Sequence, residues 1–134
     1  MTTRKKKTKL QRRKSDPYSP YWKKKCWELL RKQFADKCKV CNATKFVNLH
    51  HLLDKKAFPD LCMEPMNLLP LCPKHHKFGR LSAHCNSVWF ANWLEQNYPA
   101  QYKWVMEWGV LPKPASKLNY QATHHALQIV FKNS

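Results

Sequence analysis

Apolar side chains recur at helical spacing in four stretches of the chain. In residues 20–34 they lie three or four positions apart and leave lysines and arginines between them, which predicts an amphipathic helix. The same spacing predicts a helix over residues 87–98 and another that begins at Pro99 and ends before Gly109. A last helix is expected within residues 119–132.

Alternation with a period of two replaces the helical pattern in residues 46–53, FVNLHHLL. Successive side chains of a strand fall on opposite faces, so His50 and His51 are expected to point apart. Residues 67–72, NLLPLC, form a second extended segment, whose proline confines it to an edge or a bulge. Residues 54–65 between them are a polar, proline-containing loop. The pattern therefore predicts a small α+β fold with short strands flanked by helices.

Composition divides the chain into three consecutive segments. Residues 1–15 contain eight basic residues, no acidic ones and a single leucine, so segment 1–16 is expected to be a disordered arm. Residues 17–110 hold both predicted strands and most of the helices, and residues 111–134 are expected to be a linker and a C-terminal helix. No apolar run approaches the roughly 20 residues that cross a bilayer, so no membrane partner is expected.

The charge of the chain points to a polyanionic partner. Lys and Arg number 25 against eight Asp and Glu, a net charge of +17, whereas a merely solubilising surface normally carries both signs. Nucleic acid is the commonest intracellular polyanion. The basic residues expected to contact its phosphates are Lys5, Lys6, Lys7, Arg12, Arg13, Lys14, Lys23, Lys24, Lys77 and Arg80.

The cysteine spacing is typical of a zinc site. Cys38 and Cys41 form a CxxC knuckle, and Cys72 with His75 forms a Cys-x-x-His pair further along the chain. Two intervening residues let each pair turn around one ion, so together they predict a structural Cys3His zinc site that contributes to the folding free energy. The alternative is two unrelated thiol pairs in a reduced core. Cys26 lies on an apolar helical stripe and is expected to be a packed thiol.

Four polar residues near this site are left over: His50, His51, Asn67 and His76. With His75 at the zinc, the adjacent His76 is expected to project elsewhere from the same turn. There it would meet a histidine of the first strand in a second metal centre with open coordination positions. Each residue also has a structural interpretation when taken singly, His51 as a half-buried core histidine and Asn67 as a turn residue.

Three motifs taken together, CKVC, LHHLL and NLLPLCPKHH, resemble the HNH (ββα-metal) nuclease motif in a zinc-stapled, phage-type form. The resemblance covers residues 38–76 and implies a ββα-metal hairpin–helix core with a structural zinc knuckle. It implies that His50 and His76 hold a catalytic divalent ion, Mg²⁺ or another. It further implies that His51 is the general base and that Asn67 braces the hairpin.

Two details extend or qualify the resemblance. The stretch GRLSAHCNSVWFANWL is similar to a downstream segment of some phage-type HNH nucleases, which makes His84 a candidate third ligand, with helix capping or DNA contact as alternatives. His75 stands where many relatives have a fourth cysteine, a conservative exchange for zinc. The pair His124 and His125 lacks nearby cysteine or acidic partners and is expected to be a surface feature.

The resemblance implies a metal-dependent DNA endonuclease of low sequence specificity in the cytoplasm of a bacterial host cell. Its substrate would be double-stranded or branched DNA. The main alternative is a non-catalytic, zinc-stapled nucleic-acid-binding module, which would have no use for His51 and His76. A nuclease that acts on RNA is a third hypothesis. The sequence leaves the oligomeric state open.

Overall fold

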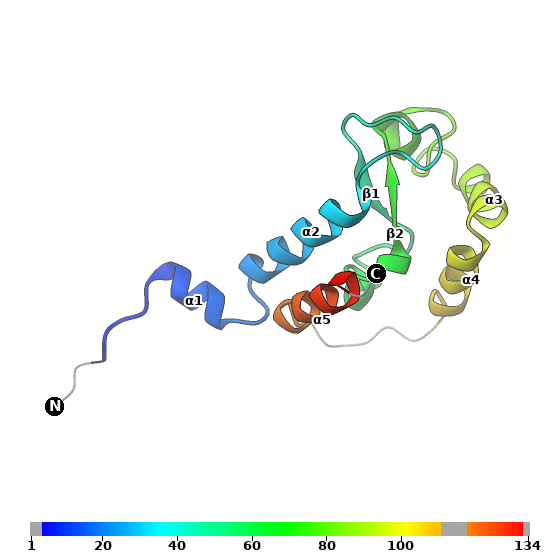
Figure 1. The fold of residues 1–134 in the computed structure, drawn as a ribbon. Coiled ribbons are helices and arrows are strands. Elements are labelled where there is room, and N and C mark those ends of the chain that lie inside the picture. Colours follow the sequence, from blue (N-terminus) through cyan, green and yellow to red (C-terminus); the bar gives the residue numbers. More distant parts are fainter. Residues whose placement is uncertain (1–3, 111–117, 133–134) are drawn as a thin grey trace. The chain divides into compact units, whose positions relative to one another are not determined.

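A computed structural model of the chain describes residues 4–110 and 118–132 (Figure 1). Its α-helices are α1 (Lys9–Ser15), α2 (Pro20–Phe34), α3 (Ser87–Asn97), α4 (Pro99–Trp108) and α5 (Tyr120–Lys132). Its strands are β1 (Asn48–His51) and β2 (Leu68–Leu71). Three short helices are η1 (Pro59–Leu61), η2 (Pro65–Asn67) and the π-helix η3 (Lys74–Phe78). The protein is therefore a small α+β protein, as the pattern predicts.

The predicted helices begin and end close to the expected residues because local signals set their termini. Proline is the first residue of both α2 and α4, where its missing N–H has no intrahelical partner to lose. Asn86 caps α3, since its side-chain oxygen accepts a hydrogen bond from the N–H of Trp89 at 3.0 Å. Gly109 is the C-terminal cap of α4. No described helix is long and apolar enough to cross a membrane.

Part of the segment expected to be disordered is helical. The hydroxyl of Thr8 accepts a hydrogen bond from the N–H of Gln11, whose side-chain oxygen in turn accepts one from the N–H of Thr8 at 2.8 Å. This capping box starts α1, and Arg12, Arg13 and Lys14 in its last turn complement the helix dipole. No residue of α1 is buried. The expectation of disorder considered only the shortage of apolar residues and overlooked the capping pair.

The described residues form two compact units, whereas composition predicts three consecutive segments. One unit contains residues 4–29 and 118–132, and the other contains residues 30–110. The predicted linker at residues 111–117 lies outside the described residues. Residues from the two ends of the chain therefore build one unit together.

In the first unit, α5 packs against the beginning of α2. The thiol of Cys26, which is fully buried as its helical spacing predicts, donates to the carbonyl of Tyr120 at 3.1 Å. The N–H of Gln121 donates to the carbonyl of Pro17 at 3.1 Å. These bonds join segments that lie far apart in the sequence.

In the second unit, β1 and β2 form an antiparallel two-stranded sheet in which Asn48 pairs with Leu71 and His51 pairs with Leu68. Pro70 is tolerated within β2 because each strand of a two-stranded sheet has an open edge. Its carbonyl accepts a hydrogen bond at 3.0 Å from the N–H of Lys39 in the CxxC segment. The sheet is thereby joined to the predicted zinc knuckle.

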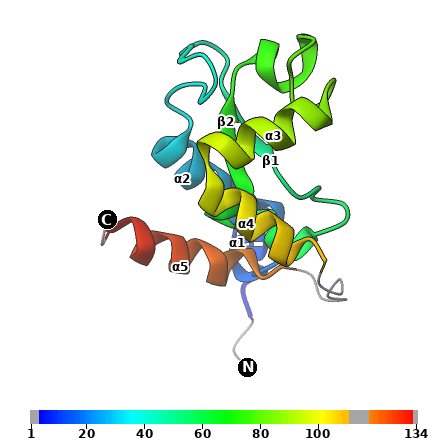
Figure 2. The ribbon, with the colours of Figure 1, turned by 90° about the vertical axis from the view of Figure 1, so that its right-hand side faces the viewer.

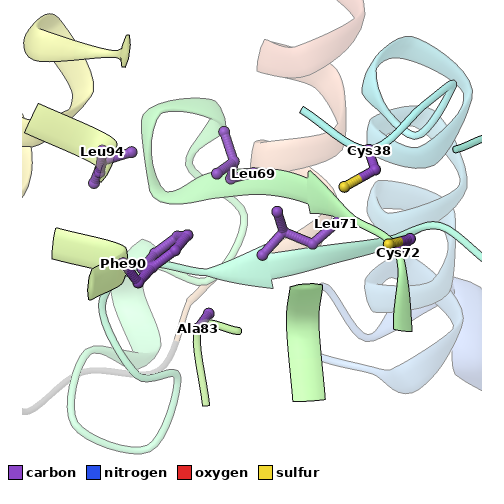
Figure 3. Packing of buried hydrophobic residues seen from close by; sticks show 7 residues of the cluster. All are labelled: Cys38, Leu69, Leu71, Cys72, Ala83, Phe90 and Leu94. Carbon is purple, nitrogen blue, oxygen red and sulfur yellow. The ribbon is translucent and has the colours of Figure 1, made fainter. Parts of the chain in front are cut away.

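Helix α3 packs against this hairpin and completes the core (Figures 2 and 3). The buried cluster contains Leu69 and Leu71 of β2, Phe90 and Leu94 of α3, together with Ala83, Cys38 and Cys72 (Figure 3). Two of its seven members are predicted zinc ligands. The predicted metal site and the hydrophobic core are therefore continuous.

Leu71→Ala should lower the free energy of unfolding by about 2–5 kcal/mol, because Leu71 is fully buried and its truncation leaves a cavity. The matched control is Leu81→Ala, which removes the same atoms from a side chain that is 51% exposed in the same unit and should cost about 1 kcal/mol or less. Chemical denaturation of the zinc-loaded protein measures both. Equal costs would contradict the assigned core.

Candidate metal centres

The thiols of Cys38, Cys41 and Cys72 lie together with the imidazole of His75, and their ligand atoms are all within 4.8 Å of one another. The Sγ atoms of Cys41 and Cys72 are 3.7 Å apart. Nδ1 of His75 lies 3.3 Å from Sγ of Cys72 and 3.9 Å from Sγ of Cys38. Tetrahedral zinc with bonds of about 2.3 Å to sulfur places its ligands roughly 3.8 Å apart. The cluster is compatible with a structural zinc site.

The CxxC knuckle owes its shape to a tight turn. The N–H of Asn42 donates to the carbonyl of Cys38 at 2.9 Å, and the N–H of Cys38 donates to the carbonyl of Ala43 at 2.8 Å. Asn42 has a φ of 64°, a left-handed conformation that asparagine adopts more readily than most residues. The turn directs both thiols of the knuckle to one point.

The pKa values of the two knuckle thiols shift in opposite directions. Burial raises the pKa of the Cys38 thiol. Hydrogen bonds from backbone groups, that of Cys72 the strongest, lower it by more, so the pKa is lowered overall. A hydrogen bond with the Ala43 backbone lowers the pKa of Cys41, yet burial and the neighbouring thiols outweigh it, and the net pKa is raised. Burial lowers the pKa of His75, which keeps its ring neutral. Crowded thiolates repel each other, and a divalent cation offsets that repulsion.

A second cluster consists of three histidines: His50 of β1, His76 of η3 and His84 of the loop before α3. One ring nitrogen from each lies within 4.8 Å of the others, and the Nε2 atoms of His76 and His84 are 3.2 Å apart. The three ring centroids are separated by 4.8–5.1 Å. Three imidazole nitrogens at this spacing can together hold one divalent ion.

The π-helix η3 places adjacent histidines in different clusters. The carbonyl of Cys72 accepts hydrogen bonds from the N–H groups of both His75 and His76, at 3.1 and 2.8 Å. The carbonyls of these two histidines in turn accept hydrogen bonds from Ala83 and His84, at 2.8 and 3.0 Å respectively. This backbone pairing holds the later loop against η3, so His84 lies beside His76.

Helix α3 contacts both clusters through neighbouring aromatic residues. The ring of Trp89 stacks against His75 at a centroid distance of 6.5 Å. The ring of Phe90 meets His50 edge-on at 5.4 Å. Because Phe90 is also a core residue, packing of the core restrains the histidine cluster as well.

Two imidazoles of the histidine cluster are neutral at pH 7. Burial, followed by the charges of neighbouring imidazoles, lowers the pKa of His50 to about 3. Burial, followed by the charges of His84 and Lys77, lowers the pKa of His76 to about 4. Both rings are therefore neutral at pH 7, the form that offers a lone pair to a metal. The cluster contains no carboxylate, and an all-imidazole donor set suits ions such as Ni²⁺ or Zn²⁺ better than Mg²⁺.

His51 lies outside both clusters, and its Nε2 is 2.9 Å from the carbonyl oxygen of Cys62. A carbonyl can only accept, so Nε2 carries a proton in this contact, and in the neutral form of the ring the lone pair is on Nδ1. The sequence did not identify Cys62 as a partner, because the group that acts is its main-chain carbonyl. No side-chain pattern could have revealed it.

Asn67 is completely buried and holds the loop between the strands. Its Oδ1 accepts a hydrogen bond from the N–H of Leu53 at 2.6 Å. Its Nδ2 donates to the carbonyls of Leu53 and Leu61, at 3.2 and 2.9 Å. Since Leu61 directly precedes Cys62, Asn67 anchors the segment that contacts His51.

The basic residues expected to contact phosphates are all exposed but belong to different units. Lys77 and Arg80 lie in and just after η3, in the unit that contains both clusters. The first unit contains the other eight: Lys5, Lys6, Lys7, Arg12, Arg13, Lys14, Lys23 and Lys24.

Comparisons of the chain with models of protein families, with curated proteins and with solved structures found no match. The assignment of a function therefore rests on the geometry of the two clusters and of His51, together with the resemblance of the motifs.

Cys41→Ser should lower the zinc content by one ion per chain and lower the unfolding temperature, because serine is a poor zinc ligand. Cys41 is exposed, so the effect would not come from lost core packing. The matched control is Cys85→Ser, a change at another exposed cysteine, which lies outside the cluster and should keep the zinc content of the wild type. Metal analysis by mass spectrometry measures both. Full zinc content in Cys41→Ser would refute the ligand assignment.

His84→Ala should weaken binding of Ni²⁺ to the zinc-loaded protein by more than the roughly 10–100-fold that loss of an outer-sphere partner costs, because a direct ligand is removed. Isothermal titration calorimetry measures the affinity. His125→Ala, a change at an exposed histidine outside the cluster, is the control and should bind Ni²⁺ like the wild type. Equal affinities for all three proteins would exclude His84 as a ligand.

Proposed function

We propose that this protein is a metal-dependent DNA endonuclease of the HNH (ββα-metal) type that hydrolyses phosphodiester bonds. The observation that carries the proposal is the arrangement around β1. His51 is oriented by the carbonyl of Cys62, and the preceding residue His50 belongs to a three-histidine cluster. An oriented base next to a cation site is what hydrolysis of a phosphodiester requires.

The order of elements supports the same family. A β-hairpin that carries His50 and His51 is followed by the short helix η3 that carries His76, and the resemblance implies a hairpin and then a helix in the ββα-metal core. Here the helix is a single π-turn of five residues. The Cys3His cluster at the start of this turn is the zinc staple that the proposal requires.

In the proposed reaction His51 is the general base. Its Nδ1 takes a proton from a water molecule, whose oxygen forms a bond to phosphorus while the bond from phosphorus to the leaving 3′ oxygen breaks. The carbonyl of Cys62 keeps accepting from Nε2, so the imidazolium that forms stays in place. When bound by His50, His76 and His84, a divalent ion supplies positive charge that stabilises the phosphate and the departing oxygen. The leaving oxygen takes its proton from solvent.

Asn67 is a positioning residue in this scheme. It is too deeply buried to touch a substrate, and its side-chain hydrogen bonds join backbone groups of the loop that leads to Cys62. By fixing that loop it fixes the acceptor of the His51 hydrogen bond. The resemblance assigns the same bracing role to this asparagine.

Affinity for DNA would come mainly from charge. The exposed Lys77 and Arg80 lie next to His76 in the sequence and are placed to contact phosphates close to the bond that is cut. The basic residues of the first unit add backbone contacts that position DNA without reading its sequence. Low sequence specificity is the expected consequence.

His51→Ala should reduce nicking of supercoiled plasmid by about 10²–10⁴-fold, the usual contribution of a general base. The assay offers Ni²⁺, Mn²⁺ and Mg²⁺ in turn to the zinc-loaded protein. As controls, the variant should keep the zinc content and the Ni²⁺ affinity of the wild type, which would show that both metal centres are intact.

Two results would count against the proposal. Wild-type rates of nicking in His51→Ala would remove the assigned base. DNA binding without cleavage by the wild type, with all three ions, would favour the non-catalytic nucleic-acid-binding module instead. Offering RNA beside DNA in the same assay distinguishes the substrate.

A further inference from the structure

The first unit contains a groove whose lining residues are distant along the chain from the residues of both metal clusters. This groove has no part in the proposed reaction. It has a volume of about 360 Å³. Its lining comes from α2 and from α5 with the residue before it, and consists of Trp22, Asn119, Gln121, Ala122, His124, His125 and Gln128. The volume is at the lower end of the roughly 300–1,000 Å³ of small-molecule sites. It suits one aromatic heterocycle rather than an extended chain.

The aromatic wall of the groove is held in place on two sides. The indole N–H of Trp22 donates to the carbonyl of Lys14 at 2.9 Å. Its ring meets that of His124 at a centroid distance of 5.6 Å. These contacts orient the indole before any ligand arrives.

Helix α5 contributes a polar stripe to the lining of the groove. Gln121, His125 and Gln128 are spaced four and three residues apart, so they lie on one face of the helix, and all three are exposed. An amide side chain donates and accepts hydrogen bonds at the same time, and so does a neutral imidazole. Nucleobase edges present the same mixture of donors and acceptors, and glutamine is a common partner of adenine.

The charge of this unit identifies the kind of molecule that would bring a heterocycle to the groove. Residues 1–29 and 117–134 contain 13 Lys and Arg but only two Asp and Glu, a net charge of +11 out of the total of +17. No residue of the groove lining or of α5 is acidic. Lys23 and Lys24 directly follow Trp22 in the sequence and are exposed. A base attached to a phosphate backbone matches both the groove and its surroundings.

We propose that the groove between Trp22 and α5 binds an unpaired nucleobase of the DNA substrate, stacked on the indole and hydrogen-bonded by the glutamines of α5. This inference rests on the proposed function, because it names the form of DNA that the nuclease prefers. A base within a continuous duplex is paired and stacked, and it cannot enter the groove without being extruded. The protein therefore binds gapped or branched DNA more tightly than continuous duplex.

The test measures binding of two fluorescent DNA probes of identical sequence by anisotropy. One is a continuous duplex, and the other has a short gap that exposes unpaired thymine and adenine bases. The protein is the full-length, zinc-loaded chain with His51→Ala, so that the probes stay intact. Tighter binding of the gapped probe than of the duplex is expected, and equal binding of the two would overturn the inference.

Two variants test whether the groove causes the tighter binding of the gapped probe. Trp22→Ala should weaken binding of the gapped probe about tenfold, as loss of one base–aromatic stack does, and should leave duplex binding unchanged. Because Trp22 also contacts Lys14 and His124, the double variant Gln121→Ala, Gln128→Ala removes only exposed side chains and should act in the same direction. Trp108→Ala, a change at an exposed tryptophan of α4 in the other unit, is the matched control. A gap preference that survives both groove changes would overturn the inference.

Plasmid nicking by the wild type without any gap preference would reject the groove and keep the nuclease. Gap-dependent binding that requires Trp22, without cleavage under any of the three ions, would keep the groove and reject the nuclease.

Discussion

The carbonyl oxygen of Cys72 accepts hydrogen bonds from two successive N–H groups, those of His75 and His76, and both metal clusters depend on the turn that results. Adjacent side chains on a regular strand would point to opposite faces, and on an α-helix they would be about 100° apart. In this turn His75 joins the three thiols, whereas His76 joins His50 and His84. A structural ion at the first cluster would thus hold a ligand of the second cluster in position through a single peptide bond.

The core extends this coupling beyond the turn. Cys38 and Cys72 belong to the buried cluster that also contains Phe90, and Phe90 contacts His50. Small proteins obtain limited stability from apolar burial alone, so a metal that ties the knuckle to the core adds stability where it is needed. The same packing contacts also restrain the histidine side chains. A metal site whose ligands are restrained in this way favours ions that accept its geometry. In this protein, folding and preparation of the second cluster depend on the same packing.

Under the proposed function the two units would have different tasks. The unit of residues 30–110 contains the clusters and carries a moderate share of the positive charge. The other unit carries most of that charge and has few buried residues, and it contains the groove beside Trp22. Long-range attraction to phosphate needs exposed cations but no deep core, whereas hydrolysis needs fixed atoms in a restrained site.

The sequence by itself determined what depends on neighbours along the chain: the helix termini at Pro20, Pro99 and Gly109, the short strands, and the CxxC and Cys-x-x-His pairs. Each follows from spacing or from the conformational limits of one residue type. Only the tertiary structure decided that His84 lies beside His76, because a backbone hydrogen bond between η3 and the loop after it has no periodic signal. It likewise decided the contact of His51 with the carbonyl of Cys62 and the meeting of Trp22 with α5. Main-chain groups carry no sequence signature, and contacts between distant segments depend on how the whole chain packs.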